Sequence, residues 1–164
     1  LILKSRRIIL KVQRQPNRAS CLATAFAMVM DVSIHELIDE IGHDGTAVWW
    51  PDARPHPNDC RGFHIQELIE CCLRRNLAVV QIEPRPCFVS PETGEIRGMK
   101  FPDSTRMSRH MCNTQGVFTG TTKTGARHAW AWDGESLWCP TLAGVVPLDD
   151  YDLQHLYALF PIRC

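Results

Sequence analysis

The chain has 164 residues, of which 45% are apolar, and 18 basic residues balance 18 acidic ones to give a formal net charge of zero. This size and composition predict one globular domain over residues 1–164 with its own hydrophobic core. The balanced charge gives no electrostatic footprint for nucleic acid, so we expect no nucleic-acid partner. Because no apolar stretch reaches the roughly 18 to 20 residues of a membrane span and the N-terminus lacks a signal-peptide pattern, we expect a cytoplasmic protein with no membrane partner.

The eight cysteines are many for this length, and their even number would permit disulfides. Several lie inside helical or strand patterns, as small buried hydrophobic residues do, for example in the segment IECCL. Without a secretion signal, the reducing cytosol is the expected compartment. We therefore expect free thiols.

The first part of the chain is predicted to be mainly helical after a short strand at residues 7–12. Residues 21–30 are almost all apolar or small, which predicts a helix without a solvated face that runs through the middle of the fold. Ser20 is the expected N-cap of this helix. Ser33 opens a Ser-x-x-Glu capping box, which predicts a second helix that ends at Gly42.

The middle of the chain alternates between loops and regular elements. Residues 44–61 are rich in Pro, Gly and Asp and predict a loop or lid. Helical spacing of apolar residues follows at 63–75, and the segment LAVVQIE at 77–83 predicts a strand. Residues 84–113 contain four prolines and little periodicity, so no fold is predicted for them.

The last part of the chain is predicted to be antiparallel β-structure. Asp133 and Gly134 form a DG pair, which is a signal for a two-residue hairpin turn. Helices followed by antiparallel strands favour an α+β domain with an N-terminal helical lobe packed on a C-terminal sheet. The expected strands are the segments GVFTGTT, RHAWAW, SLWCP and LYALFPI.

Cys21 lies where a polar loop meets the apolar helix. Peptide dipoles and free N–H groups in the first helical turn favour negative charge, so this position is expected to lower the pKa of the thiol. His128 begins a predicted strand, and Trp130 and Trp132 at alternate positions are expected to share its face of the sheet. A cysteine on a central helix that faces a histidine on a sheet predicts a thiolate–imidazolium pair.

Gln15 stands six residues before Cys21. A loop leading into the helix can fold the Gln15 side-chain amide back toward the sulfur. There, the amide and the Cys21 backbone N–H would hold a developing oxyanion.

These residues together resemble the papain-like cysteine peptidases. The likeness rests on Gln15, the step to Cys21, the apolar helix CLATAFAM, and the strand HAWAW headed by His128. It is nearest to the compact bacteriocin-processing branch, the double-glycine leader peptidases, and to its stand-alone phage and bacterial relatives, and it covers residues 7–42 and 116–162. The resemblance implies a papain-like fold, hydrolysis of a peptide or isopeptide bond in a peptide or protein substrate without a cofactor or metal, and a preference for small residues such as glycine.

The residue that orients the histidine departs from the family pattern, in which an Asp or Asn ends the next strand. Here a thiol, Cys139, takes the corresponding place, because a two-residue turn would bring Cys139 opposite His128. Asp133 is five residues after His128, which is roughly 16 Å along a strand and on the other face from His128, so Asp133 is predicted to be a turn residue only. Three possibilities stay open: a Cys-His dyad, a third hydrogen bond from a loop residue, or weakened activity.

Three further interpretations compete with the hydrolase. Cys21 and His128 are, taken singly, ordinary buried core residues. A papain-like fold with decayed catalysis would serve as a peptide- or protein-binding module, with Trp49 and Trp50 in the polar loop as candidate binding residues. Cys21, His128 and Cys139 would alternatively converge as a zinc site. The oligomeric state is left open.

The segment HPNDCRGFH also invites a metal interpretation, because His56, Cys60 and His64 are four residues apart. That spacing requires a continuous helix. Pro57 and Gly62 argue against one, so His64 is predicted to be a residue at a helix start.

Overall fold

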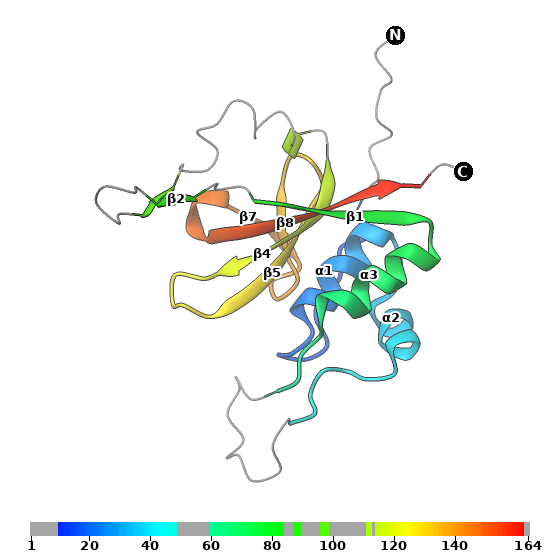
Figure 1. Cartoon of the computed structure of the whole chain (residues 1–164). Coiled ribbons are helices and arrows are strands. Elements are labelled where there is room, and N and C mark those ends of the chain that lie inside the picture. The colour runs from blue at the N-terminus through cyan, green and yellow to red at the C-terminus, as the bar shows by residue number, and fades with distance from the viewer. Residues whose placement is uncertain are drawn as a thin grey trace.

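The computed structural model describes residues 10–48, 60–83, 87–89, 96–98, 111–112 and 114–162. In chain order, the elements are α1 (Cys21–Met30), α2 (Ile34–Ile41), α3 (Ile65–Arg74), β1 (Leu77–Ile82), β2 (Cys87–Val89), β3 (Ile96–Gly98), β4 (Gln115–Thr121), β5 (Arg127–Trp132), β6 (Leu137–Cys139), β7 (Gly144–Val146), the short 3-10 helix η1 (Leu148–Asp150) and β8 (Asp152–Pro161). Six strands form an antiparallel sheet in the order β1-β8-β4-β5-β6-β7, and β2 pairs with β3 separately. The three α-helices gather on one side of the large sheet, which confirms the predicted α+β class (Figure 1).

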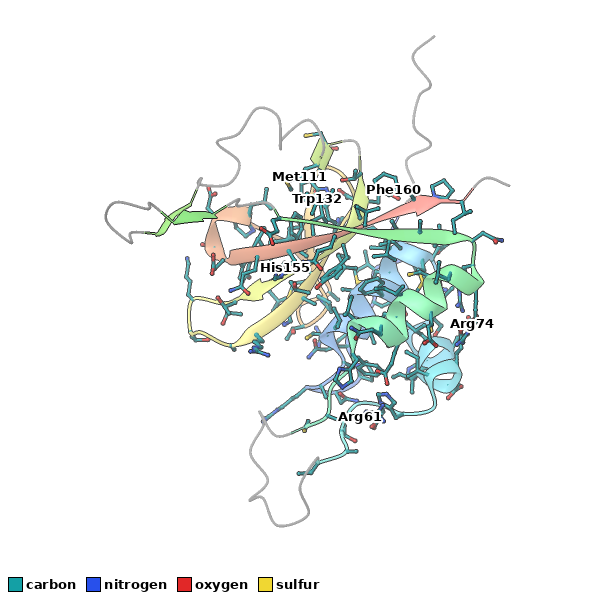
Figure 2. All side chains as sticks on the ribbon, in the orientation of Figure 1. Arg61, Arg74, Met111, Trp132, His155 and Phe160 are labelled. Carbon is teal, nitrogen blue, oxygen red and sulfur yellow. The ribbon has the colours of Figure 1, made fainter. Side chains whose placement is uncertain are left out.

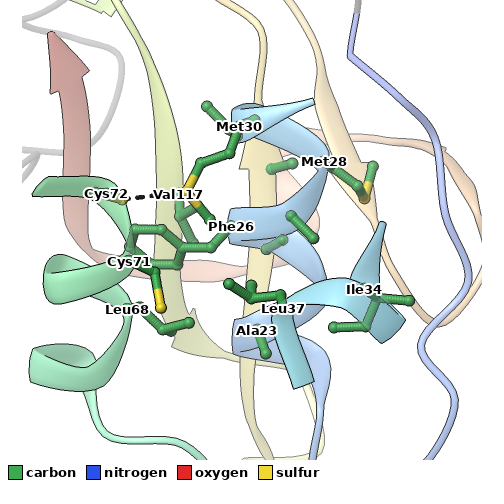
Figure 3. Close-up of a cluster of buried hydrophobic side chains, with 14 of the residues drawn as sticks. Ala23, Phe26, Met28, Met30, Ile34, Leu37, Leu68, Cys71, Cys72 and Val117 are labelled. Atoms are coloured by element: carbon green, nitrogen blue, oxygen red, sulfur yellow. Dashed lines mark hydrogen bonds between the residues drawn. The ribbon is translucent and has the colours of Figure 1, made fainter. Parts of the chain in front are cut away.

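Helix α1 is the centre of the helical layer. Its residues from Ala23 to Met30 are all buried, as the absence of a polar face predicts. It packs on β4 and β5 and contacts both α2 and α3. Figure 3 shows Phe26 and Met30 among the residues that fill the space between α1, α3 and the sheet, together with Leu68 and Val117. The helix predicted at residues 21–30 is therefore confirmed at the same bounds.

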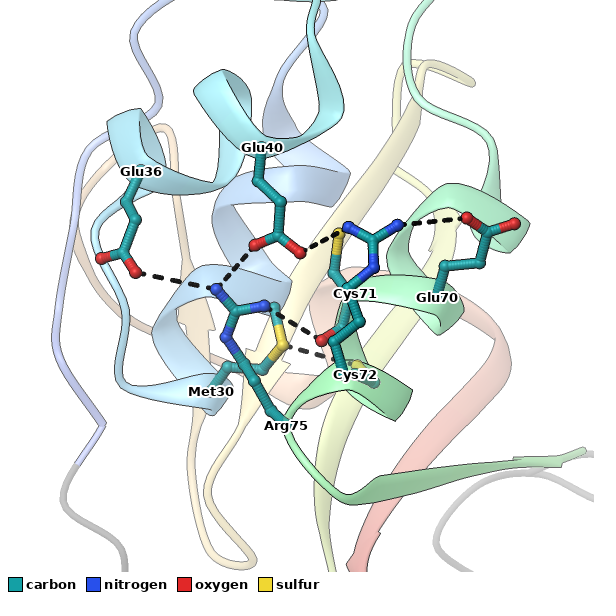
Figure 4. A network of polar contacts seen from close by, with 8 residues as sticks. Met30, Glu36, Glu40, Glu70, Cys71, Cys72 and Arg75 are labelled. Carbon is teal, nitrogen blue, oxygen red and sulfur yellow. Dashed lines mark hydrogen bonds and ion pairs between the residues drawn. The ribbon is translucent and has the colours of Figure 1, made fainter.

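Helices α2 and α3 are joined by charged side chains at the surface (Figure 4). Glu40 of α2 accepts hydrogen bonds from both Arg74 and Arg75, each at 2.7 Å. The Arg75 guanidinium is the main cause that lowers the pKa of the Glu40 carboxyl. Helix α2 begins and ends at the predicted residues, and Gly42 adopts a left-handed conformation with φ +88°. The Ser33 hydroxyl accepts the His35 N–H and not that of Glu36, so this cap differs from the predicted capping box.

The large sheet buries a different set of side chains on each face. On the face covered by the helices, β5 contributes the small residues Ala129 and Ala131, which belong to the cluster that contains α1. On the outer face, β5 contributes Trp130 and Trp132 to a second buried cluster. Figure 2 shows Trp132 beside Met111, and the Trp132 indole donates a hydrogen bond to the Met111 carbonyl at 2.9 Å. The alternation along one strand thus separates small from large residues.

The hairpin between β5 and β6 is longer than the two-residue turn expected from the DG pair. Trp132 pairs with Leu137, so the loop comprises residues 133–136. The Asp133 carboxylate accepts the N–H of Glu135 at 2.8 Å and the N–H of the following residue at 2.6 Å. The two-residue turn is therefore wrong, because the Asp133 side chain stabilises a wider loop.

Three other expectations meet different outcomes. Residues 10–12, the described part of the strand expected at 7–12, do not lie in a strand. Strand β7 was not predicted at all. Within the segment left without a predicted fold, β2 and β3 form an antiparallel pair.

Among the described residues, no helix is alone long and apolar enough to cross a membrane. Helices α1 and α2 meet that measure only together, as a pair bent by 115°.

Candidate active site at the start of helix α1

The first turn of α1 is open at its N-terminus. Ser20 occupies the N-cap position, but its hydroxyl makes no cap hydrogen bond and instead donates to the Asn17 carbonyl at 2.9 Å. The expected capping by Ser20 is therefore wrong in its chemistry. Because no side chain takes the first N–H groups, those of Cys21 and Leu22 are directed at the Cys21 sulfur.

The Cys21 sulfur lies against strand β5. The backbone N–H groups of Ala129, Leu22 and Cys21 itself hydrogen-bond to the sulfur and lower the pKa of the thiol. Burial acts in the opposite direction and outweighs them, so the net pKa of Cys21 is raised above its ordinary value. The expected ionised thiol is therefore not the resting form at neutral pH, because burial at the helix–sheet junction exceeds the effect of the helix N-terminus.

His128 lies on the outer face of the sheet, next to Trp130, as the alternation predicts. The two rings meet edge to face with centroids 4.7 Å apart. Burial lowers the pKa of His128 to about 4, which leaves the imidazole neutral at neutral pH. The described structure thus holds a neutral thiol and a neutral imidazole rather than the expected ion pair.

Cys21 and His128 belong to opposite faces of strand β5. Helix α1 packs on the face that carries Ala129, while the His128 side chain points to the opposite face. Strand β6 pairs with β5 only at Ala131 and Trp132, so the edge of β5 beside Ala129 is free of β6. The sulfur takes the Ala129 N–H there, one residue from His128. Between these described side chains, no direct hydrogen bond joins Cys21 to His128.

Cys139 meets the histidine as predicted, but through a different register. Its sulfur lies 3.4 Å from Nε2 of His128. Extending the observed pairing of Ala131 with Trp138 places Cys139 opposite Trp130, two residues from the expected position. The contact therefore runs along the diagonal of one sheet face, where such neighbours remain within reach. The charge of an ionised Cys139 would also raise the pKa of Cys21, as the last of its causes.

Gln15 belongs to the same site. Its backbone N–H donates to the Pro140 carbonyl at 3.0 Å, directly after Cys139. Its side-chain carbonyl accepts the Thr141 hydroxyl at 3.1 Å. With the carbonyl held by Thr141, the Gln15 amide N–H groups are the part of the side chain left to bind another acceptor. Thr141 was not predicted as a site residue. The one signal in the sequence is its position two residues after Cys139.

No carboxylate within the described part of the chain hydrogen-bonds to the His128 ring. Asp133 is a turn residue, as predicted, and its second oxygen accepts the Trp138 indole N–H at 2.8 Å. Asp150 pairs with Lys123 at the surface. Among the described residues, the side-chain hydrogen bond recorded for the His128 ring is the one to Cys139.

The candidate binding residues Trp49 and Trp50 lie outside the described residues, but the base of their loop is visible. Val48 forms an isolated antiparallel bridge with Cys60. Nearby, Glu67 accepts from Arg61 at 2.6 Å and lies 3.1 Å from the His43 ring. The two ends of the loop are thus fastened to each other and to α3.

The zinc interpretation of Cys21, His128 and Cys139 gains no support from the geometry, and His56 of the second interpretation lies outside the described residues. Among the described residues, no group of three or more His, Cys, Asp or Glu side chains is placed to hold a metal ion, which includes Cys21, His128 and Cys139. His64 is the N-cap of α3 and forms a capping box with Glu67, as expected for a residue at a helix start. Six cysteines are free thiols: Cys21, Cys60, Cys71, Cys72, Cys112 and Cys139.

Comparison with known proteins gives no relative for this arrangement. No protein-family model, no curated protein and no solved structure matches the chain. The chemistry of the site is therefore argued from its own geometry. It pairs the His128 imidazole with the Cys139 thiol, holds the Gln15 amide beside the residues that follow Cys139, and places the half-buried Cys21 thiol beside Ala129.

Proposed function

We propose that this protein is a papain-like thiol hydrolase that cleaves a peptide or isopeptide bond by acyl transfer. One observation carries the proposal: the Cys21 sulfur, at an open helix N-terminus, is bound by the N–H of Ala129, the residue that follows His128. This neighbourhood supports a nucleophile and a base supplied by two separate elements. A peptide or protein substrate and a cytoplasmic location belong to the same proposal.

The directions of the two pKa shifts support general-base catalysis over a preformed ion pair. His128 Nε2 faces Cys139, which leaves Nδ1 as the nitrogen for Cys21. As the sulfur attacks the carbonyl carbon, Nδ1 takes the thiol proton. It then returns the proton to the leaving amine as the C–N bond breaks. Water, deprotonated by the same imidazole, hydrolyses the thioester and restores the thiol.

Gln15 supports the oxyanion in this proposal. Thr141 holds the Gln15 carbonyl oxygen, which leaves the amide N–H groups to bind a substrate oxygen. Together with the Cys21 backbone N–H, they would bind the negative charge that develops on the carbonyl oxygen. Because its backbone is fixed to Pro140 as well, Gln15 needs little reorganisation as that charge forms.

The decisive experiment measures alkylation of each cysteine by iodoacetamide at pH 7, with mass spectrometry of wild type and His128→Ala. If His128 is the base for Cys21, the rate at Cys21 falls by at least about tenfold in the variant. The exposed Cys112 provides the internal control and should react equally in both proteins. Equal rates at Cys21 would remove His128 from this role and with it the hydrolase.

A decayed scaffold that binds peptides is the second candidate, and one observation favours it. A neutral thiol accepts hydrogen bonds weakly, and Cys139 is the partner of His128 Nε2. Cys139→Asn separates the two candidates, with turnover followed on a panel of blocked fluorogenic peptides and isopeptides. A weakened hydrolase gains about tenfold or more in kcat, since the amide orients the ring better. A binding module shows no turnover in either protein.

A further inference from the structure

The hairpin of β6 and β7 carries the most exposed apolar side chains among the described large hydrophobic residues. Leu142, at the turn, is 61% exposed, and Val145, on β7, is 56% exposed. Ala143 between them adopts a left-handed conformation with φ +52°, and its N–H is bound by the Cys139 carbonyl at 2.8 Å. The hairpin therefore presents both side chains from a defined turn.

Strand β7 is also an edge of the large sheet, and no described strand pairs with its outer side. Natural proteins usually protect such an edge with charges, a bulge or a covering element. The run from Leu142 to Val146 contains no charged residue. The opposite edge strand, β1, lies between the charged residues Arg75 and Glu83. An apolar edge that no described strand covers has main-chain groups ready to pair with an extended peptide.

This edge is continuous with the candidate active site. Cys139, at the base of the hairpin, contacts His128, and Thr141, at its turn, donates to Gln15. Val145 is the cross-strand partner of Trp138, and Trp138 and Cys21 both pack against the cluster that contains Ala129. Because antiparallel partners share a face, Val145 lies on the side of the sheet from which Cys21 approaches.

We infer that β7 pairs with an extended segment of the substrate peptide, and that Leu142 and Val145 bind an apolar side chain of that segment. The inference rests on the proposed function, since it names the substrate surface of the same site. Alternate residues of an extended peptide face the same way. The preferred peptide therefore carries apolar residues at alternate positions, next to the small residues expected at the scissile bond.

The first test uses binding alone, in the Cys21→Ala protein, with acetyl-Val-Leu-Val-Gly-Gly-amide as the probe. Backbone hydrogen exchange should slow in residues 144–146 when the probe is added. Leu142→Lys and Val145→Lys should each abolish that protection. Val80→Lys, at a 46% exposed apolar residue on the opposite edge strand, is the matched control and should leave it intact.

The second test uses turnover, with a library of blocked octapeptides varied at one position at a time. Val145→Lys should lower kcat/KM for apolar peptides about 10- to 100-fold and shift the preference at one position toward Asp and Glu. If Val145→Lys cleaves peptides with an unchanged preference and the probe does not slow exchange of the β7 amides, the inference is overturned while the proposed hydrolase stands. If the β7 amides are protected but no peptide is cleaved, the binding surface is retained and the hydrolase is removed. A dimer in solution that Val145→Lys dissociates also overturns the inference, because a second copy then covers the edge.

Discussion

The two faces of the large sheet are built by opposite means. On the helix face, β5 places only alanines beneath α1, and this small volume lets the helix approach the strand closely. On the outer face, the same strand fills the core with Trp130 and Trp132. The helix face supplies Cys21 and the outer face supplies His128 and Cys139. The comparison teaches that the candidate site is a junction of two layers, where neither face alone holds a complete set of groups.

The largest expected effect comes from removing either layer's contribution to the chemistry. Cys21→Ala and His128→Ala should each lower kcat/KM by on the order of 10⁴-fold or more, because nucleophile and base act as one unit. For the same reason, the double variant should be no worse than the worse single variant. Initial rates on a cleaved peptide measure this, and additive losses would show that the two faces act independently.

A smaller loss is expected at Gln15, which approaches the junction from the N-terminal loop. Gln15→Ala should lower kcat about 10²- to 10³-fold, because an oxyanion donor acts mainly in the transition state. Thr141→Val removes the hydroxyl that holds the Gln15 carbonyl and should lower kcat by a smaller factor. Steady-state kinetics distinguish the two. A loss confined to KM would mean that Gln15 only binds substrate.

Protonation of His128 at low pH should lower the free energy of unfolding, because this residue is partly buried on the outer face. Its pKa is lowered from 6.5 to about 4 in the folded protein, so between these values the unfolded state binds the proton that the folded state excludes. The contribution of the neutral His128 to the free energy of unfolding is therefore fully present above about pH 6.5. It falls by up to about 3 kcal/mol as the pH drops to about 4. Urea unfolding at several pH values measures the slope. His128→Gln should flatten it, and an unchanged slope would assign it to other groups.

The smallest effects separate the packing of the two faces. Ala129→Leu adds volume where α1 meets β5 and should lower the free energy of unfolding by about 1 to 3 kcal/mol. Trp130→Phe on the outer face should change it by less than about 1.5 kcal/mol, because the buried Trp130 indole N–H has no partner among the described residues. Thermal or urea unfolding measures both. Equal costs would mean that the two faces are packed to the same tolerance.

Local patterns predicted most of the architecture. Helix α1 and strand β5 follow from hydrophobic runs and alternation, and α2 begins and ends at the expected Ser33 and Gly42. The register of β6 was wrong because it depends on how the Asp133 carboxylate folds back on its loop. Strand β7 was missed because three residues are too few for a pattern.

The candidate site was predicted as a set of four residues, Gln15, Cys21, His128 and Cys139. Hydrogen bonds join His128 to Cys139 and Gln15 to Thr141, while Cys21 lies beside the Ala129 N–H, and their joint catalytic role stays a prediction. Their ionisation was not predictable, because the pKa values depend on burial, which only the three-dimensional packing determines. The role of the Ala129 N–H was also not predictable, because every residue except proline has a backbone N–H and the residue type does not indicate which one binds the sulfur.

That backbone donor makes part of the site invisible to side-chain mutagenesis. An alanine scan across residues 127–132 would leave the N–H of residue 129 in place, and Ala129 would be scored as silent. A backbone ester at this position, introduced by chemical synthesis or an α-hydroxy acid, deletes the donor while it preserves shape. Genetic screens of this protein would thus underestimate how much its sulfur depends on the main chain.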